Sequence, residues 1–155
     1  MCAGTAITRT RLTGVLIEAN HHRIHTRGPD SEPEVRFLFR DPIAQLPVIL
    51  NGKIQVIEWG NRNDKTSRLP QTGWCRRESL EAGKWTWLKP VSVVIPANYG
   101  LEKGVWFPIR EGMEGVVVLD ADGQPHVYML TQAASTGYEE LTKHNRMPCL
   151  IGQTI

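Results

Sequence analysis

The sequence predicts an α+β fold, built of mostly antiparallel β-sheets or a partly closed barrel with two or three short helices. Its 14 glycines and 10 prolines in 155 residues leave little room for long helices. Most apolar runs are short, rich in β-branched residues and bounded by turn residues, which is typical of strands. A chain of this length is near the common size of one domain, so we expect a single domain over residues 1–155.

The N-terminal third contains the strongest local signal. Residues 14–19 (GVLIEA) could form a strand or a short helix, and residues 21–34 read as an irregular loop. Residues 46–50 (LPVIL) and 53–59 (KIQVIEW) are two β-rich runs joined by Asn51-Gly52. This dipeptide favours a type I′ turn, so the segment predicts a β-hairpin.

The central region alternates loops, one helix and one strand. Residues 62–73 are polar and punctuated by proline and glycine, which indicates a loop. Residues 76–87 are the best helix candidate here, although Gly83 limits the length. Residues 91–95 (VSVVI) predict a strand that ends at Pro96.

The C-terminal third is mainly strand-like. Residues 105–110 and 116–130 predict strands, with a hairpin turn at residues 120–124 (DADGQ). Residues 136–144 predict one helix, with Thr136 as N-cap and Glu139 as its capping-box partner. Residues 148–155 return to an extended pattern.

Charge and cysteine content exclude several classes of protein. Lys and Arg number 18 against 16 Asp and Glu, a formal charge of +2, so any nucleic-acid surface must be a local patch. The three cysteines show no CxxC spacing, which argues against a disulfide framework or a zinc site and favours a reducing cytoplasm. The N-terminal segment lacks the apolar stretch of a signal peptide, and no apolar run is long enough to span a membrane. We expect no cofactor and no metal.

Cys2 is the first residue that suggests chemistry. Removal of Met1 would place a free α-amine and a thiol on one residue, which we expect to be exposed at the N-terminus. The amine, with a pKa of about 8, can attack an aldehyde to form a Schiff base, and the thiol can then close a thiazolidine ring. Position alone favours a small apolar residue near a chain end.

Four further segments, together with this start, resemble the SRAP (SOS response-associated peptidase) family. That family typically begins Met-Cys-Gly-Arg and carries a His-Asp-Arg-Met-Pro signature near its C-terminus. The corresponding segments here are residues 1–4 (MCAG), Trp59-Gly60, residues 74–79 (WCRRES), Ile95-Pro96-Ala97 followed by Glu102, and residues 144–148 (HNRMP). Their order and spacing extend over nearly the whole chain.

The resemblance implies a sensor of abasic sites in single-stranded DNA that forms a covalent crosslink. In this scheme Cys2 captures the aldehyde of the opened abasic sugar. Glu102 transfers protons during ring opening and Schiff-base formation, and His144 stabilises or protonates the sugar oxygen. Both roles are physically sensible, since a carboxyl group can exchange protons near neutral pH if burial raises its pKa, and an imidazole titrates there with little change.

The resemblance also implies a DNA surface that includes Arg76, Arg77, Arg146 and Trp74. Guanidinium groups bind phosphate without regard to sequence, and tryptophans can stack on unpaired bases. Arg146 could equally hold its own loop, and most of the five tryptophans are expected to pack in the core. We expect a monomer.

Some positions depart from the family pattern and keep other functions open. Trp74 stands where the family has asparagine, and Gly4 where it has arginine. These losses are consistent with a single-stranded DNA-binding protein that no longer forms the covalent crosslink. A thiol peptidase that removes its own N-terminal residue with Cys2 and His144 is a third reading. The spacing of His22 and His25 would suit a metal, but no carboxylate or thiolate partner is evident.

Overall fold

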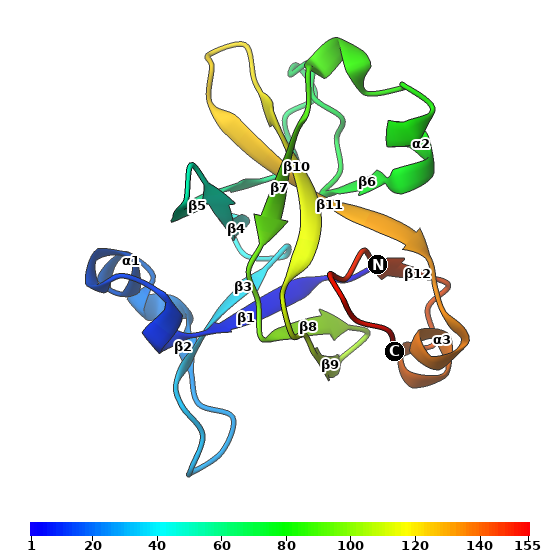
Figure 1. The fold of residues 1–155 in the computed structure, drawn as a ribbon. Helices are drawn as coiled ribbons and strands as arrows, with labels where there is room; N and C mark the ends of the chain where they lie inside the picture. Colours follow the sequence, from blue (N-terminus) through cyan, green and yellow to red (C-terminus); the bar gives the residue numbers. More distant parts are fainter.

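Two antiparallel-rich β-sheets and three short α-helices make up the protein, as a computed structural model describing all of residues 1–155 shows (Figure 1). The α+β prediction is therefore confirmed. The first sheet has five strands in the order β2-β3-β1-β8-β9. Its strands are β1 (Gly4–Thr8), β2 (Ile24–His25), β3 (Glu34–Leu38), β8 (Tyr99–Glu102) and β9 (Val105–Pro108).

Five strands of the second sheet close into a barrel. β10 pairs with β7 on one side and with β11 on the other, and β11 pairs in parallel with β5, which completes the ring through β4. The barrel strands are β4 (Gln45–Leu50), β5 (Lys53–Trp59), β7 (Val91–Ile95), β10 (Met113–Leu119) and β11 (Pro125–Ala133). Two short strands, β6 (Trp74–Arg76) and β12 (Arg146–Pro148), pair with the C-terminal part of β11.

The hairpin of β4 and β5 forms as the sequence predicts. Asn51 and Gly52 have φ angles of 52° and 75°, so both adopt the left-handed conformation of a type I′ turn. Leu50 pairs with Lys53 across this turn. At the far end of β5, Gly60 has a φ of 60°, and an added Cβ would lie 2.2 Å from the carbonyl oxygen of Thr72. Only glycine fits this close approach without strain.

The three α-helices are α1 (Gly14–Ala19), α2 (Arg77–Glu81) and α3 (Thr136–Thr142). The open choice for residues 14–19 resolves to helix, because the Thr13 side chain caps it by accepting from the Leu16 backbone N–H. Thr136 is not the N-cap of α3. Ser135 takes that place and accepts from the backbone N–H of Tyr138, and the helix ends two residues before His144.

Several short elements complete the fold. Residues 9–11, 21–23 and 86–88 form 3-10 turns. β2 lies within the predicted loop of residues 21–34, since its two residues find a partner in β3. The helix predicted over residues 76–87 is confined to α2, and Gly83 with a φ of 78° follows its end.

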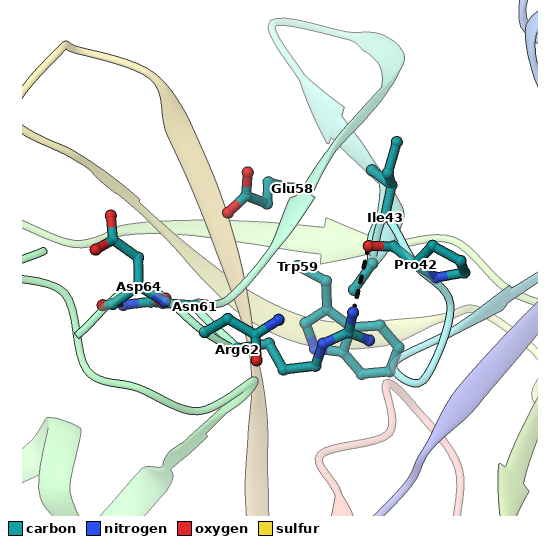
Figure 2. A pocket seen from close by; sticks show the side chains of 9 residues that line it. Pro42, Ile43, Glu58, Trp59, Asn61, Arg62 and Asp64 are labelled. Atoms are coloured by element: carbon teal, nitrogen blue, oxygen red, sulfur yellow. Dashed lines mark hydrogen bonds between the residues drawn. The ribbon is translucent and has the colours of Figure 1, made fainter. Parts of the chain in front are cut away.

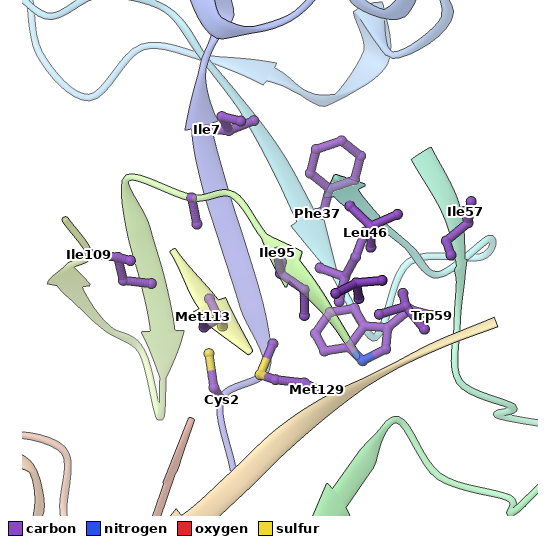
Figure 3. Close-up of a cluster of buried hydrophobic side chains, with 14 of the residues drawn as sticks. Cys2, Ile7, Phe37, Leu46, Ile57, Trp59, Ile95, Ile109, Met113 and Met129 are labelled. Carbon is purple, nitrogen blue, oxygen red and sulfur yellow. The ribbon is translucent and has the colours of Figure 1, made fainter. Parts of the chain in front are cut away.

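The main core lies between the five-stranded sheet and the barrel (Figure 3). Phe37 from β3, Trp59 from β5 and Ile95 from β7 are fully or almost fully buried in it. A second, smaller cluster surrounds Tyr128 and Trp85, whose rings meet edge to face at 4.9 Å. The N-terminal segment enters the main core directly before β1.

Candidate functional site

Cys2 is buried, which corrects the expectation of an exposed thiol. It belongs to the main core cluster, where Figure 3 shows it, and has no exposed surface. The thiol donates to the carbonyl oxygen of Gly4 over 3.3 Å. Side chains alternate in this extended segment, so Met1 and Ala3 are exposed while Cys2 points inward.

Burial also changes the chemistry of the thiol. It raises the pKa of Cys2 to about 12, because a thiolate in apolar surroundings loses its hydration. Cys75 and Cys149 are buried too, and burial raises their pKa values to about 12 and about 11. All three cysteines are therefore thiols at neutral pH, and none is a ready nucleophile while the chain is folded in this form.

The two side chains expected to work with Cys2 meet at the α-amino group of Met1. The Met1 nitrogen lies 3.0 Å from Oε1 of Glu102 and 2.7 Å from Nε2 of His144. Glu102 and His144 also approach each other, with 3.7 Å between Oε1 and Nδ1. Residues 42 positions apart in the chain thus form one acid-base pair around a primary amine.

The fold holds Glu102 from two sides. The residue ends β8, next to β1, and only 2% of it is exposed. From α3, the hydroxyl of Tyr138 donates to Oε1 over 3.2 Å. Burial, together with the nearby Cys2 and Glu102, raises the pKa of Tyr138 above its usual value, so it stays a neutral hydrogen-bond donor. Glu102 is therefore no solvated loop carboxylate.

Tyr138 is a site residue that sequence reasoning missed. Its helical spacing to Thr142 places both on one face of α3, and both are buried. That periodicity was the available signal. It indicates an inward face but not which strand that face contacts, and the contact with Glu102 depends on the packing of α3 against β8.

The position of His144 follows from the end of α3. Lys143 takes the left-handed conformation after the helix, with a φ of 62°, and turns the chain toward β12. An ammonium group can only donate, so Nε2 of His144 accepts from Met1 and the ring proton lies on Nδ1. Nδ1 lies 3.1 Å from both the carbonyl oxygen and the backbone nitrogen of Arg146, and a proton on Nδ1 selects the carbonyl oxygen as its partner. Nε2 is thus an acceptor directed at the N-terminal amine.

A groove of about 400 Å³ opens beside this amine, and we call it the amine groove. Its lining combines the N-terminus, the histidine signature and three residues from the β6 region: Met1, His144, Arg146, Thr72, Trp74 and Arg76. Three of the four residues predicted to bind DNA therefore border it. The groove is large enough for a small ring such as a sugar.

Trp74 borders the amine groove, but contacts with other protein groups occupy its Nε1 and part of its ring. Its Nε1 donates to the carbonyl oxygen of Cys2 over 3.0 Å, which fixes the N-terminal segment. Its ring packs on Phe39, with 4.7 Å between ring centroids, and on Trp59 at 5.9 Å. The indole therefore holds the Cys2 backbone in place.

The three predicted arginines differ in availability. Arg146 is bound to both carboxylate oxygens of Glu78, at 2.7 and 3.2 Å, and to Thr131, so it holds its own loop. Arg77 is paired with Glu114 and Gln132, away from the amine groove. Arg76 is largely exposed and lies at 3.9 Å from Glu78. Of the three, Arg76 alone presents an accessible guanidinium at the groove.

A separate hollow of about 280 Å³ lies at the end of β5, and it contains none of the predicted site residues (Figure 2). Arg62 projects along it and donates to the carbonyl oxygens of Phe39, Asp41 and Pro42. The guanidinium thus provides hydrogen-bond donors for the backbone carbonyl groups of the turn after β3.

His22 and His25 belong to no group of three or more residues able to hold a metal ion. No helix in the structure combines the length and apolar character that crossing a membrane requires. In comparisons with known proteins, no family model and no curated protein matches this chain.

Proposed function

We propose that this protein captures abasic sites in single-stranded DNA through Cys2 after Met1 has been removed. The single observation that carries the proposal is the placement of the Met1 amine, one residue from the Cys2 nitrogen, against both Glu102 and His144. An acid-base pair around a primary amine is what condensation of an amine with an aldehyde requires. The resemblance of five segments to the SRAP family supports the same reading.

The reaction proceeds in two steps that balance without an external reagent. The Cys2 amine adds to the aldehyde of the opened deoxyribose, and loss of one water gives a Schiff base. The Cys2 sulfur then adds to the imine carbon, while the thiol proton passes to the nitrogen, and a five-membered thiazolidine ring closes. Because burial raises the pKa of the Cys2 thiol, the reacting species is the neutral thiol, and its proton leaves as the C–S bond forms.

Glu102 and His144 have distinct tasks in this scheme. Glu102 relays protons, donating one to the sugar ring oxygen as the ring opens and one to the hydroxyl that leaves as water. The free Nε2 of His144 accepts a proton from the ammonium form of the amine, which makes the nitrogen nucleophilic. Arg76 at the mouth of the amine groove binds a flanking phosphate.

The test uses protein that begins at Cys2, incubated with a single-stranded oligonucleotide that carries one abasic site. A heat-stable adduct on a denaturing gel is expected for the wild type and for Cys149→Ala, a control that removes another buried thiol. Cys2→Ala should give none. An undiminished adduct with Cys2→Ala, or no adduct with the wild type, would overturn the proposal.

Burial of the Cys2 thiol favours one second candidate, a protein that binds single-stranded DNA without forming a bond. In that case the amine groove binds the strand and Cys2 serves only in the core. The same experiment separates the two functions, since this candidate requires a mobility shift under native conditions and no adduct after denaturation.

A further inference from the structure

The largest groove described in the structure carries no acidic residue. It has a volume of about 450 Å³ and crosses β3, β8 and β9 of the five-stranded sheet. Its polar lining is basic, and we call it the basic groove: His25, Arg36, Arg40 and Lys103, with the ring of Trp106 as an apolar wall. Three of the chain's 18 Lys and Arg residues thus line one concave surface that carries no carboxylate.

The cations of the basic groove are only partly neutralised. Arg36 shares the buried carboxylate of Glu34 with Arg27, each at 2.9 Å. One carboxylate therefore faces two guanidinium groups. Arg40 and Lys103 are exposed, and Lys103 donates only to a backbone carbonyl, that of Lys143, over 2.9 Å. The groove keeps a clear excess of positive charge, which attracts a polyanion.

The basic groove begins where the candidate site ends. Ala3 lines the basic groove and Met1 lines the amine groove, and both side chains point outward because Cys2 between them points inward. The bond from Lys103 to Lys143 also ties the rim of the basic groove to the residue before His144. The two grooves therefore flank the N-terminal segment on its exposed side.

We infer that the basic groove binds the sugar-phosphate backbone of the DNA strand beyond the nucleotide held at Cys2. The inference rests on the proposed function for the choice of single-stranded DNA as the polyanion. It adds a surface outside the residues of the amine groove, where Arg146 is occupied by Glu78. Arg40 and Lys103 contact phosphates. The guanidinium groups of Arg27 and Arg36 lie over the Trp106 ring, so Trp106 forms the wall of the groove.

The experiment measures binding of undamaged single-stranded oligothymidine by fluorescence anisotropy over a range of salt concentrations. The test variant is Arg40→Gln with Lys103→Gln, and the matched control is Lys53→Gln with Lys84→Gln. The control removes two exposed charges outside the groove, so the net charge falls equally. Thermal unfolding of both variants verifies that they are folded.

The test variant should reduce the slope of log affinity against log salt by about 1.4, since each phosphate contact on a single strand contributes about 0.7. Between 50 and 200 mM salt, the wild type then loses about sevenfold more affinity than the variant. The control should keep the wild-type slope. Equal slopes for test and control variants, or no binding by the wild type, would overturn the groove assignment.

The outcome is independent of the covalent chemistry. If the test variant loses salt-dependent binding while no abasic adduct forms with any protein, the groove assignment stands and the crosslinking proposal fails. If the adduct forms normally in the test variant and its salt slope is unchanged, the groove assignment fails and the crosslinking proposal stands.

Discussion

Replacing Tyr138 with phenylalanine removes one hydroxyl and leaves the packing around it intact. The ring keeps its edge-to-face contact with Phe107, whose centroid lies 5.3 Å away, so no large cavity forms. What is lost is the donor to Oε1 of Glu102, a carboxylate that is almost fully buried. A hydrogen bond to a charged group contributes about 1.5–3 kcal/mol.

We therefore expect Tyr138→Phe to lower the free energy of unfolding by about 2 kcal/mol. For a domain of this length, that corresponds to a fall in Tm of roughly 4–8 °C. Differential scanning calorimetry measures both quantities. Because the carboxylate also loses a partner that fixes its position, adduct formation should slow as well.

Tyr99→Phe is the matched control, since Tyr99 is half-buried and its contact with Arg27 is made by the ring. It should change Tm by less than about 2 °C, since a substitution that removes no specific contact usually changes stability by less than about 0.5 kcal/mol. A Tyr138→Phe variant as stable as the wild type, or one shifted no further than Tyr99→Phe, would refute the role given to this hydroxyl.

Three further predictions concern the barrel and the thiols. Burial lowers the pKa of His126, but Asp120, the Gly60 carbonyl and Glu58 together outweigh it and raise the pKa above 6.5. The stabilisation by His126 is therefore full below about pH 6.5 and is lost as the pH rises through the pKa of His126 in the folded protein. Urea unfolding at several pH values should show this loss of stability, and Asp120→Asn should make the loss smaller. Gly60→Ala should lower the free energy of unfolding by about 2–5 kcal/mol, because the new Cβ combines a left-handed conformation with a clash against the Thr72 carbonyl oxygen. The same urea unfolding measures this loss, and a loss under about 1 kcal/mol would contradict the close approach of Gly60 to Thr72. In the folded protein that retains Met1, iodoacetamide at pH 8 should alkylate the Cys2 thiol only slowly. Peptide mapping measures this alkylation, and rapid alkylation of Cys2 would disprove its burial.

The sequence predicted those secondary-structure elements that depend on residues within the element itself. The hairpin of β4 and β5 follows from Asn51-Gly52, because two residues with positive φ set both the turn and the register. β6 and β12 could not be predicted, since each has three residues and exists through its pairing with β11. Closure of the barrel by the parallel contact of β5 with β11 depends on tertiary packing in the same way.

The candidate site was predictable only as a set of residues. The resemblance to the SRAP family grouped Cys2, Glu102 and His144 as an expectation, and the structure brings Glu102 and His144 to the Met1 amine. Burial of Cys2 depends on how β1 enters the core, which no local pattern encodes. The pairing of Arg146 with Glu78 joins residues 68 positions apart, so sequence reasoning could only leave that arginine open between phosphate and its own loop.

The central claim is that the amine and the thiol of Cys2 act together, so activity must depend on a free N-terminus at that residue. The most direct measurement is the intact mass of the protein after incubation with an abasic single strand, before and after a cleavable leader is removed to expose Cys2. We predict no adduct before cleavage, and after cleavage a species with the summed mass of protein and oligonucleotide less one water. An adduct of equal yield before cleavage, or none after it, would contradict the account.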